Sequence, residues 1–233
     1  MSGFEDVSVV LITRNEEKAI TKVITDILAA APSAEVIVVD GSDDATPELA
    51  SAAGATVMRE PAEGGFGPAL LMALTSATRP IVVTLDADDT YPVTMIGPLA
   101  DLVRSGFDVA GGSRISRGRP PAMPAPNYLA NLLFARLGGL AVGQRAEDPH
   151  SGMRAYRREV IHGIRWSTRG LAFPVDLLLL PIAEGWKVVE VPIRYRERIG
   201  ETTLERLPST GWTLRRIGRA FSRRLRGSSG RRS

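Results

Sequence analysis

Short apolar runs alternate with helical patterns along the first half of the chain. Continuous apolar or β-branched residues predict strands at 7–12, 34–40, 55–60 and 80–88. Between them, the spacing of apolar positions predicts a helix after "TRNEE", a short helix that Gly54 ends, and a helix over "PALLMALTSAT". Continuous apolar strands that alternate with amphipathic helices are typical of a parallel sheet covered on both faces. The pattern therefore predicts a doubly wound α/β fold.

The second half has a less regular pattern. It predicts strands at 108–114 and 186–198, a strand or turn that enters a helix at 151–161, and a helix at 127–140. The segment "GRPPAMPAP" is predicted to be a loop, because proline is excluded from helix interiors and central strands. From Leu214 onward, apolar residues recur at helical spacing among arginines. We therefore expect one folded domain over 1–207, a basic amphipathic helix over 208–226 and a disordered tail over 227–233.

Composition and charge narrow the class of protein. The chain of 233 residues is 44% hydrophobic, which is enough for one substantial core, and its lack of cysteine excludes disulfides and cysteine-ligated zinc. The net charge of +3 hides an asymmetry, because residues 194–233 hold 12 Arg and 3 Glu. No apolar run has the length of a signal peptide or a membrane span. We expect a cytoplasmic protein, at most peripheral on the inner face of the membrane.

Three carboxylates follow the fourth predicted strand, in the segment "IVVTLDADDTYP". If the strand pleat continues through Ala87, Asp86 and Asp88 point the same way, and two like charges so close favour a cation beside them. Carboxylate oxygens suit Mg²⁺ or Mn²⁺, and magnesium usually keeps water and phosphate oxygens in its shell. The segment therefore indicates a divalent ion that holds a diphosphate. The alternative is a solvated acidic turn in which Asp89 or Thr90 caps the next helix.

Other polar residues fall beyond the carboxyl ends of strands, where ligands bind in doubly wound sheets. Arg14 follows the first predicted strand and Asp40 ends the second. Asp40 could accept hydrogen bonds from a nucleotide base or ribose hydroxyls, or it could cap the following helix. The segment "GGFGPA", which includes Gly65, offers backbone N–H groups at a helix N-terminus and so favours an anion. It matches neither the Walker pattern nor G-x-G-x-x-G.

Seven segments in order give the chain a family resemblance. They resemble the successive motifs of family-2 glycosyltransferases with the GT-A fold, and within that family the dolichol-phosphate mannose synthase and polyprenyl-phosphate glycosyltransferase branch. The segments, which span about residues 5–205, are "VVLITRNEEKAI", "VIVVDGSDDAT", "GGFGPAL", "VTLDADDTYP", "DVAGGSR", "EDPHSGMRAYRREV" and "EGWKVVEVPIRYRERIGETTL". The resemblance implies that residues 1–207 form a catalytic domain with a Rossmann-like sheet, and that the donor is a nucleoside-diphosphate sugar.

The resemblance also implies roles for residues near the strand ends. Residues after the first two strands would line the nucleoside pocket, namely Ile12, Arg14, Glu16 and Asp40. Asp86 would lie near the ribose and diphosphate, while Asp88 would bind the Mg²⁺ or Mn²⁺ cofactor. Negative charge develops on the leaving diphosphate, and a metal ion with an arginine is the direct way to stabilise that charge.

Further along the chain, the resemblance implies residues that face the reacting groups. Arg114 and Arg154 would face the phosphates or the acceptor. Asp148, which follows Glu147, would be the general base if the acceptor were a hydroxyl. An acceptor phosphate is already anionic and needs no strong base. His150 is either an auxiliary base or a structural histidine.

Departures from the branch leave the acceptor open. The chain reads "DADDT" where the branch often reads "DADLQ", so the third metal ligand is undetermined. The segment "PAMPAPNYLANLL" has no arginine, and "GETTL" stands where the branch usually has "GESKL". Two cationic contacts to an acceptor phosphate are therefore absent, although Arg196, Arg198 and the tail helix remain. The acceptor is expected to be a polyprenyl phosphate or, alternatively, a soluble small molecule or natural product with a hydroxyl group.

We therefore expect a metal-dependent, inverting glycosyltransferase. One rival is a sugar nucleotidyltransferase, which normally has a glycine-rich basic loop where this chain has "TRNEEK". Another is a non-catalytic binding subunit, against which the intact Asp86 and Asp88 argue. The tail helix could lie on an anionic membrane or pack on the core. Its basic tract belongs to no nucleic-acid motif, so nucleic acid is not an expected partner, and the oligomeric state stays undetermined.

Overall fold

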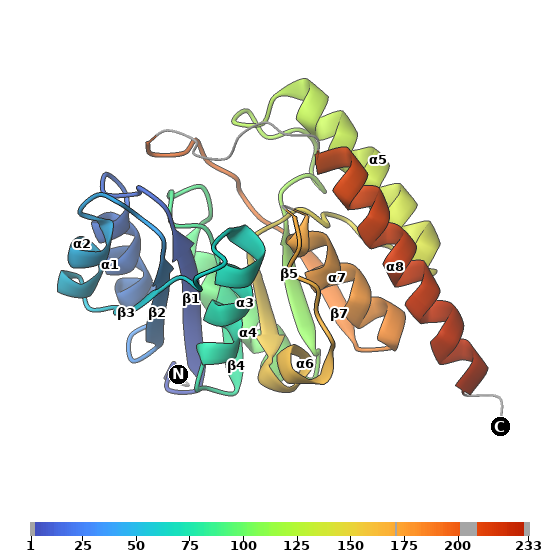
Figure 1. Ribbon diagram of the computed structural model, residues 1–233, viewed down its shortest axis with the longest axis horizontal. Helices are drawn as coiled ribbons and strands as arrows, with labels where there is room; N and C mark the ends of the chain where they lie inside the picture. The colour runs from blue at the N-terminus through green and yellow to red at the C-terminus, as the bar shows by residue number, and fades with distance from the viewer. Residues whose placement is uncertain (1–2, 171, 201–208, 231–233) are drawn as a thin grey trace.

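The computed structural model of the protein describes residues 3–170, 172–200 and 209–230. In these ranges, seven strands form one sheet in the order β3-β2-β1-β4-β6-β5-β7 (Figure 1). The strand β6 runs antiparallel to β4 and β5, and the other neighbours are parallel. The predicted doubly wound, mostly parallel sheet is confirmed. Its strands are β1 (Val7–Thr13), β2 (Glu35–Asp40), β3 (Thr56–Arg59), β4 (Ile81–Thr84), β5 (Val109–Ser113), β6 (Arg154–Arg157) and β7 (Val188–Pro192).

Helices cover both faces of the sheet, which is why the central strands are apolar on both sides. One apolar cluster joins the sheet to α1 (Ile20–Ala30), α2 (Thr46–Ala52) and α4 (Ile96–Arg104), which follows the short turn η1 (Val93–Met95). The cluster on the other face includes α3 (Phe66–Ser76), α6 (Arg158–Gly163) and α7 (Phe173–Glu184). The sequence pattern predicted neither α4 nor α7. In α7 every residue from 173 to 183 is buried, so no polar face reveals a helical period.

The strand β4 ends earlier than the sequence predicts. It stops at Thr84, whereas the apolar run predicts a strand through residue 88. The chain turns at the carboxylates instead, where Asp89 has a left-handed φ of 63°. Asp86 and Asp88 therefore lie on a loop beyond the edge of the sheet, and the expected continuation of the pleat through Ala87 is wrong.

Two long helices lie side by side along one side of the molecule (Figure 1), α5 (Ala125–Val142) and α8 (Ser209–Gly230). The helix α8 packs on α7 and α5, with Ile217 and Ala220 buried. The Asp176 carboxylate of α7 pairs with Arg216 and Arg219 of α8. Of the two alternatives for the tail helix, packing of one of its faces on the core is the one observed.

The helix α8 continues to residue 230, whereas the sequence predicts a helix to 226 and a disordered tail from 227. Residues 201–208, which hold most of "GETTL", and residues 231–233 lie outside the described ranges. Within those ranges, no helix has the length and apolar character needed to cross a membrane.

Candidate active site

Loops from both halves of the chain meet beyond the carboxyl ends of the parallel strands. The segments that follow β1, β4, β5 and β7 extend from this edge in the ordinary way. Because β6 is antiparallel, the residues that precede it, and not those that follow it, lie at the same edge. The reversal brings the segment 148–152 to the carboxylates after β4. The site is therefore shared between residues far apart in the sequence.

Asp88 and Asp89 point in different directions. The Asp88 carboxylate is buried and accepts hydrogen bonds from the backbone N–H and the hydroxyl of Thr90, at 3.1 and 2.6 Å. Asp89 instead pairs with Arg196 at 2.9 Å and with Lys22 at 3.0 Å. The left-handed backbone at Asp89 produces this divergence. Asp89 is engaged by two cations and does not supply a third metal ligand in this arrangement.

Asp86 lies against the backbone of Gly152. A Cβ atom at Gly152 would approach its Oδ1 to 2.7 Å, so only glycine allows the carboxylate this position. Burial raises the pKa of Asp86 to about 7, and the Asp88 carboxylate adds to the rise, against the attraction of Arg114 and Arg198. Two carboxylates crowded in this way disfavour joint ionisation unless positive charge is added.

The Asp86 and Asp88 pair fits a divalent cation in chemical type, because such an ion prefers carboxylate oxygens and would relieve their repulsion. Among the described residues, no three His, Cys, Asp or Glu side chains gather into a metal cage. Magnesium usually takes only one or two protein carboxylates and completes its shell with water and phosphate oxygens. The pair therefore suits a cation that binds together with a diphosphate.

Arg198 lies between two of these acidic groups. Its guanidinium donates to the buried Glu16 carboxylate at 2.5 Å, and its Nε is 3.3 Å from Asp88 Oδ2. The backbone holds it there, since the N–H of Ile199 donates to the carbonyl of Asp88 at 2.9 Å and that of Arg196 to the carbonyl of Thr90 at 3.0 Å. The segment after β7 thus lies along the carboxylate loop and places a positive charge beside Asp88.

Arg114 is fixed by the Asp148 carboxylate. Its Nε and one terminal nitrogen donate to the two Asp148 oxygens, each at 2.8 Å, and its backbone N–H donates at 2.9 Å. The guanidinium also lies 5.4 Å from the ring centroid of Tyr195, which packs edge-on against Tyr91. The Tyr91 hydroxyl in turn accepts the N–H of Gly152 at 2.7 Å. These contacts connect Arg114 to the backbone that supports Asp86.

The environment of Asp148 changes the role expected for it. Burial alone would raise the pKa of this carboxyl group, but Arg114 more than offsets burial and the pKa is lowered. The side chain is fully buried, and both of its oxygens are engaged by Arg114. In this arrangement Asp148 holds an arginine in place and is not free to accept a proton from a hydroxyl group.

Arg154 and His150 do not face the carboxylate loop. The buried guanidinium of Arg154 donates to the carbonyls of Pro174, Asp148 and Pro149. It thereby braces the segment before β6, and the role facing the phosphates or the acceptor stays a prediction. His150 lies 3.0 Å from the Thr213 hydroxyl of α8, and burial, together with Arg114, lowers its pKa to about 4. Of the two roles considered for His150, auxiliary base or structural histidine, the structural role matches this environment.

Three of the four residues expected to bind the nucleoside lie at the ends of β1 and β2, whereas the fourth, Glu16, pairs with Arg198 beside the carboxylate loop. Asp40 is buried and accepts hydrogen bonds from Thr13 at 2.8 Å and from the Ser42 hydroxyl at 2.6 Å. Arg14 is exposed and pairs with Glu60 at 2.7 Å. Ile12 is partly buried beside them on β1. Asp40 therefore organises the loop after β2 with its own hydrogen bonds.

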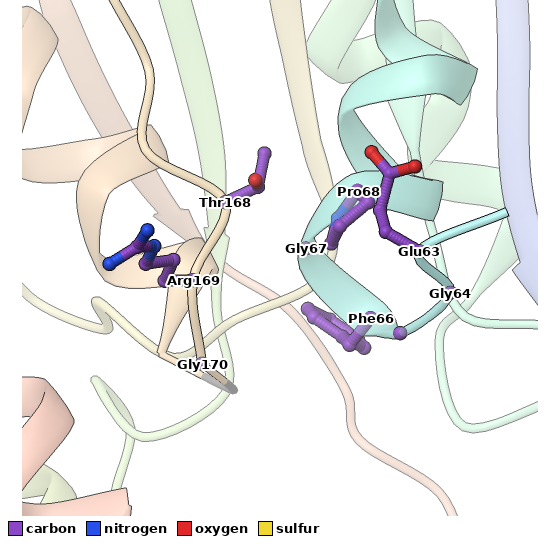
Figure 2. Close-up of a pocket in the computed structure, with 9 residues that line it drawn as sticks. Glu63, Gly64, Phe66, Gly67, Pro68, Thr168, Arg169 and Gly170 are labelled. Atoms are coloured by element: carbon purple, nitrogen blue, oxygen red, sulfur yellow. The ribbon is translucent and has the colours of Figure 1, made fainter. Parts of the chain in front are cut away.

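Gly65 lines a cavity of about 450 Å³ at the N-terminus of α3, between this helix and the loop 168–170 (Figure 2). Gly65 has a φ of 93°, and no atom lies within 4 Å of a Cβ placed there. Gly67 is different, because its Cβ would lie 1.9 Å from the Thr168 carbonyl oxygen. The close contact of α3 with this loop therefore depends on glycine at 67.

Sequence reasoning missed several residues of the site. Gly152 and Tyr195 stand inside quoted motifs, but nothing in the sequence reveals that they contact Asp86 and Arg114. Glu190 could have been noticed, because it is a single carboxylate within the apolar strand "VVEVP". It accepts the backbone N–H groups of Glu147 at 2.6 Å and Asp148 at 2.9 Å, and so holds the segment that contains Asp148.

The arrangement combines two carboxylates with two positioned arginines beyond the edge of a parallel sheet. Such a site can hold a metal-bound diphosphate and stabilise negative charge as it develops on that group. The α3 cavity and the polar loop after β2 lie at the ends of neighbouring strands, where the rest of a nucleotide would extend.

Comparison with known proteins identifies relatives of the chain. The chain is 45% identical over 203 residues to the dolichyl-phosphate hexose transferase of Haloferax volcanii, covering 87% of this chain and 88% of that protein. It is 31% identical to the polyprenol monophosphomannose synthase of Mycolicibacterium smegmatis, covering 82% of this chain and 77% of that protein.

The fold of the chain also resembles a solved structure. It is that of glucosyl-3-phosphoglycerate synthase from Mycobacterium tuberculosis in complex with Mn²⁺, uridine diphosphate and phosphoglyceric acid, with a TM-score of 0.70 and 26% identity. The match covers 93% of this chain and 78% of that one. The family model for glycosyl transferase family 2 matches residues 8–165. The chain therefore belongs to glycosyl transferase family 2.

Proposed function

We propose that the protein transfers a hexose, with inversion, from a nucleoside-diphosphate sugar to a polyprenyl phosphate. Membership of the family supports glycosyl transfer, and the 45% identity to a dolichyl-phosphate hexose transferase supports a lipid phosphate as acceptor. The observation that carries the proposal is the Asp148–Arg114 pair beside Asp86 and Asp88.

The pair matters for the acceptor in two ways. It fixes a guanidinium near the carboxylate loop, where it can contact a phosphate. It also engages the carboxylate that would otherwise be the general base, and His150 is packed against α8. An acceptor hydroxyl needs a base within hydrogen-bond reach, whereas a phosphate oxygen is already a nucleophile. The site therefore suits an acceptor that brings its own negative charge.

In the proposed reaction, an acceptor phosphate oxygen forms a bond to the anomeric carbon from the face opposite the donor diphosphate. The bond from that carbon to the diphosphate oxygen breaks, and its electron pair leaves with the nucleoside diphosphate. A divalent cation held by Asp88, with Asp86 beside it, would supply positive charge to the leaving diphosphate. Arg114 and Arg198 would contact the phosphates, while Asp40 and the α3 N-terminus with Gly65 would position the nucleoside part of the donor.

A soluble acceptor is the second candidate. The neighbour from Mycobacterium tuberculosis was crystallised with phosphoglyceric acid, a small acidic molecule. The absence of arginine from "PAMPAPNYLANLL" also favours it, because this segment would otherwise contribute a cation to a lipid phosphate. The two candidates share the donor site and differ only in the acceptor.

Transfer from labelled UDP-hexose and GDP-hexose with Mn²⁺ tests the proposal, with dolichyl phosphate in detergent and phosphoglyceric acid as alternative acceptors. We expect a lipid product, and NMR of its anomeric centre should show inverted configuration. Asp88→Asn should abolish transfer, while Asp101→Asn, at an exposed aspartate of α4, should not. If product forms with phosphoglyceric acid but not with dolichyl phosphate, the acceptor is a soluble molecule and not a polyprenyl phosphate. Transfer by Asp88→Asn at the wild-type rate would refute the metal assignment. Chelation followed by addition of Mg²⁺ or Mn²⁺ tests metal dependence directly.

A further inference from the structure

The exposed large apolar side chains of the described residues are confined to two helices. All six lie on α5 and α8, which are neighbours in the fold (Figure 1). On α5 they are Leu129, Leu133 and Leu140, and on α8 they are Leu214, Phe221 and Leu225. Isolated exposed leucines are ordinary, but a group restricted to adjacent helices indicates a surface that contacts something.

On each helix these residues form one stripe. The α5 residues are four and seven positions apart, so they align on one side of the helix, opposite the buried Phe134 and Gly138. The α8 residues are seven and four positions apart and align likewise. Arg224 of α8 donates to the Ala141 carbonyl of α5, and the stripe that contains Leu225 lies one residue step, about 100°, around the helix from that contact. We call the two stripes together the α5–α8 face.

The charged side chains that α5 and α8 themselves contribute have a single sign. The residues of α5 include Arg136, those of α8 include six arginines, and neither helix contains Asp or Glu. Arg136 is exposed and lies on the α5 stripe between Leu133 and Leu140. Arg215 and Arg226 are exposed on α8, whereas Arg216 and Arg219 are directed to Asp176. An apolar stripe bordered by arginines without acids has the chemistry that binds an anionic lipid surface.

We propose that the α5–α8 face docks on an anionic lipid bilayer. Charge decides between a bilayer and a second copy of the chain, because pairing two such faces would bring arginines together without acidic partners. The inference goes beyond the proposed reaction, since docking depends on the outer face and not on the donor site.

Docking of the α5–α8 face would also bring a groove of the protein to the bilayer that holds the proposed lipid acceptor. A cavity of about 870 Å³ lies along α5 and is lined by Tyr128, Leu132 and Leu140, the last of which belongs to the α5–α8 face. Its lining also includes Glu147, the residue before Asp148, which holds Arg114. A chain of hydrocarbon drawn from the docked bilayer would thus meet Tyr128, Leu132 and Leu140 in a groove whose lining also includes Arg136, Arg145 and Glu147.

Vesicle co-sedimentation of the full chain tests the proposal. The vesicles are phosphatidylcholine alone, or phosphatidylcholine with about one-third phosphatidylglycerol. We expect binding only to the anionic vesicles, weakened by high salt. The double variant Leu133→Gln with Phe221→Gln should lose at least about tenfold in binding because it removes apolar contact from both helices. The pair Arg215→Gln and Arg226→Gln should lose a similar amount, since each basic residue contributes about 1 kcal/mol near such a surface.

A matched control removes two exposed cations elsewhere, with Arg79→Gln and Lys187→Gln, which lie before β4 and β7. This variant should bind vesicles as the wild type does. Three results would overturn the proposal: no binding by the wild type, an equal loss in the control, or a wild-type dimer in light scattering that the apolar double variant dissolves. Calorimetry of UDP or GDP binding with Mn²⁺ on the same variants should be unchanged, so a failure of docking and a failure of the proposed function are distinguishable.

Discussion

At the residue scale, Asp148 and Arg114 act as a unit, and a double-mutant cycle tests this. Each carboxylate oxygen is engaged by the guanidinium, so Asp148→Asn and Arg114→Gln should each lower kcat by about 10² to 10³. The combined variant should be little worse than either, because both changes remove the same positioned charge. Each single variant should also lose about 3 kcal/mol of stability, since it leaves a buried charge unpaired.

A general base would give a different result. If Asp148 accepted a proton, Asp148→Asn would remove the acidic limb of the pH–rate profile and Arg114→Gln would keep that limb. Steady-state kinetics across pH for the two variants therefore separates a positioning role from a proton-transfer role. Additive losses in the cycle would also contradict the positioning role.

Glu190 gives the stability of the protein a pH dependence. Burial raises its pKa to about 7, above the ordinary 4.5, although the N–H groups of Glu147 and Asp148 oppose the rise. The folded state therefore favours the protonated carboxyl group, and this contribution is fully present below pH 4.5 and is lost as pH rises through 7. Glu190→Gln should flatten the fall in unfolding free energy over this range. Urea titrations at several pH values measure it, and the exposed Glu197→Gln should leave the slope unchanged.

The candidate site was predictable from sequence as a set of residues but not as a set of contacts. Asp86 and Asp88 follow an apolar run, so a cation site at a strand end could be predicted. The pairing of Asp148 with Arg114 could not, because it requires the antiparallel β6, which brings residues before that strand to the site. The direction of Asp89 depends on a left-handed φ that sequence pattern does not reveal.

At the element scale, the contact of α3 with the loop 168–170 depends on Gly67. An added Cβ would meet the Thr168 carbonyl oxygen at 1.9 Å, so Gly67→Ala should force this loop away and cost about 1 to 3 kcal/mol. Gly218→Ala is the matched control, because nothing lies within 4 Å of its Cβ on α8. It should stabilise the protein by about 0.5 to 1 kcal/mol. Denaturation midpoints measure both, and a Gly67→Ala variant as stable as the wild type would contradict the contact.

The attachment of α8 depends on Asp176. Its carboxylate pairs with Arg216, which is only 4% exposed, so Asp176→Asn leaves a buried guanidinium without a charge partner. We expect a loss of about 3 kcal/mol and faster hydrogen exchange throughout α8. Arg223→Gln removes the more exposed pair with Glu184 and should cost under about 1 kcal/mol. Equal effects of the two variants would mean that burial of the pair does not matter.

Sequence pattern predicted most of the helices that have one polar face, although not α4, and it missed α7, which lacks a polar face. Apolar residues recur at helical spacing among the arginines of α8, so the helix and its basic character were predictable, although Arg216 is buried against Asp176. The helix α7 is buried along its length and contains Pro181, and such a run cannot be distinguished from a buried strand or a loop by period alone. The pairing of Asp176 in α7 with Arg216 and Arg219 depends on the fold, which places α8 beside α7.

At the scale of the whole molecule, the proposed donor site joins residues that are far apart in the sequence. Glu16 and Asp88 follow β1 and β4, while Arg114 and Arg198 follow β5 and β7. A nucleoside diphosphate with Mn²⁺ should raise the melting temperature more than the sum of their separate effects, because each ligand stabilises the binding of the other. At about 100 times the dissociation constant, the gain in stability is about 2.7 kcal/mol. Asp88→Asn should remove the excess and Asp101→Asn should keep it, as scanning calorimetry can measure.

The reversed strand β6 also determines when during synthesis the site can form. Its register pairs Ile81 with Arg157 and Thr84 with Arg154, so the centre of the sheet closes only after a long intervening segment has emerged. The strand β7 and the arginine that follows it come later still. Contacts between residues so distant in sequence form slowly, because the intervening chain must first lose entropy. A nascent chain therefore has the aspartates early and acquires the complete proposed donor site only after β7 has emerged, which ties the onset of sugar transfer to the completion of the sheet.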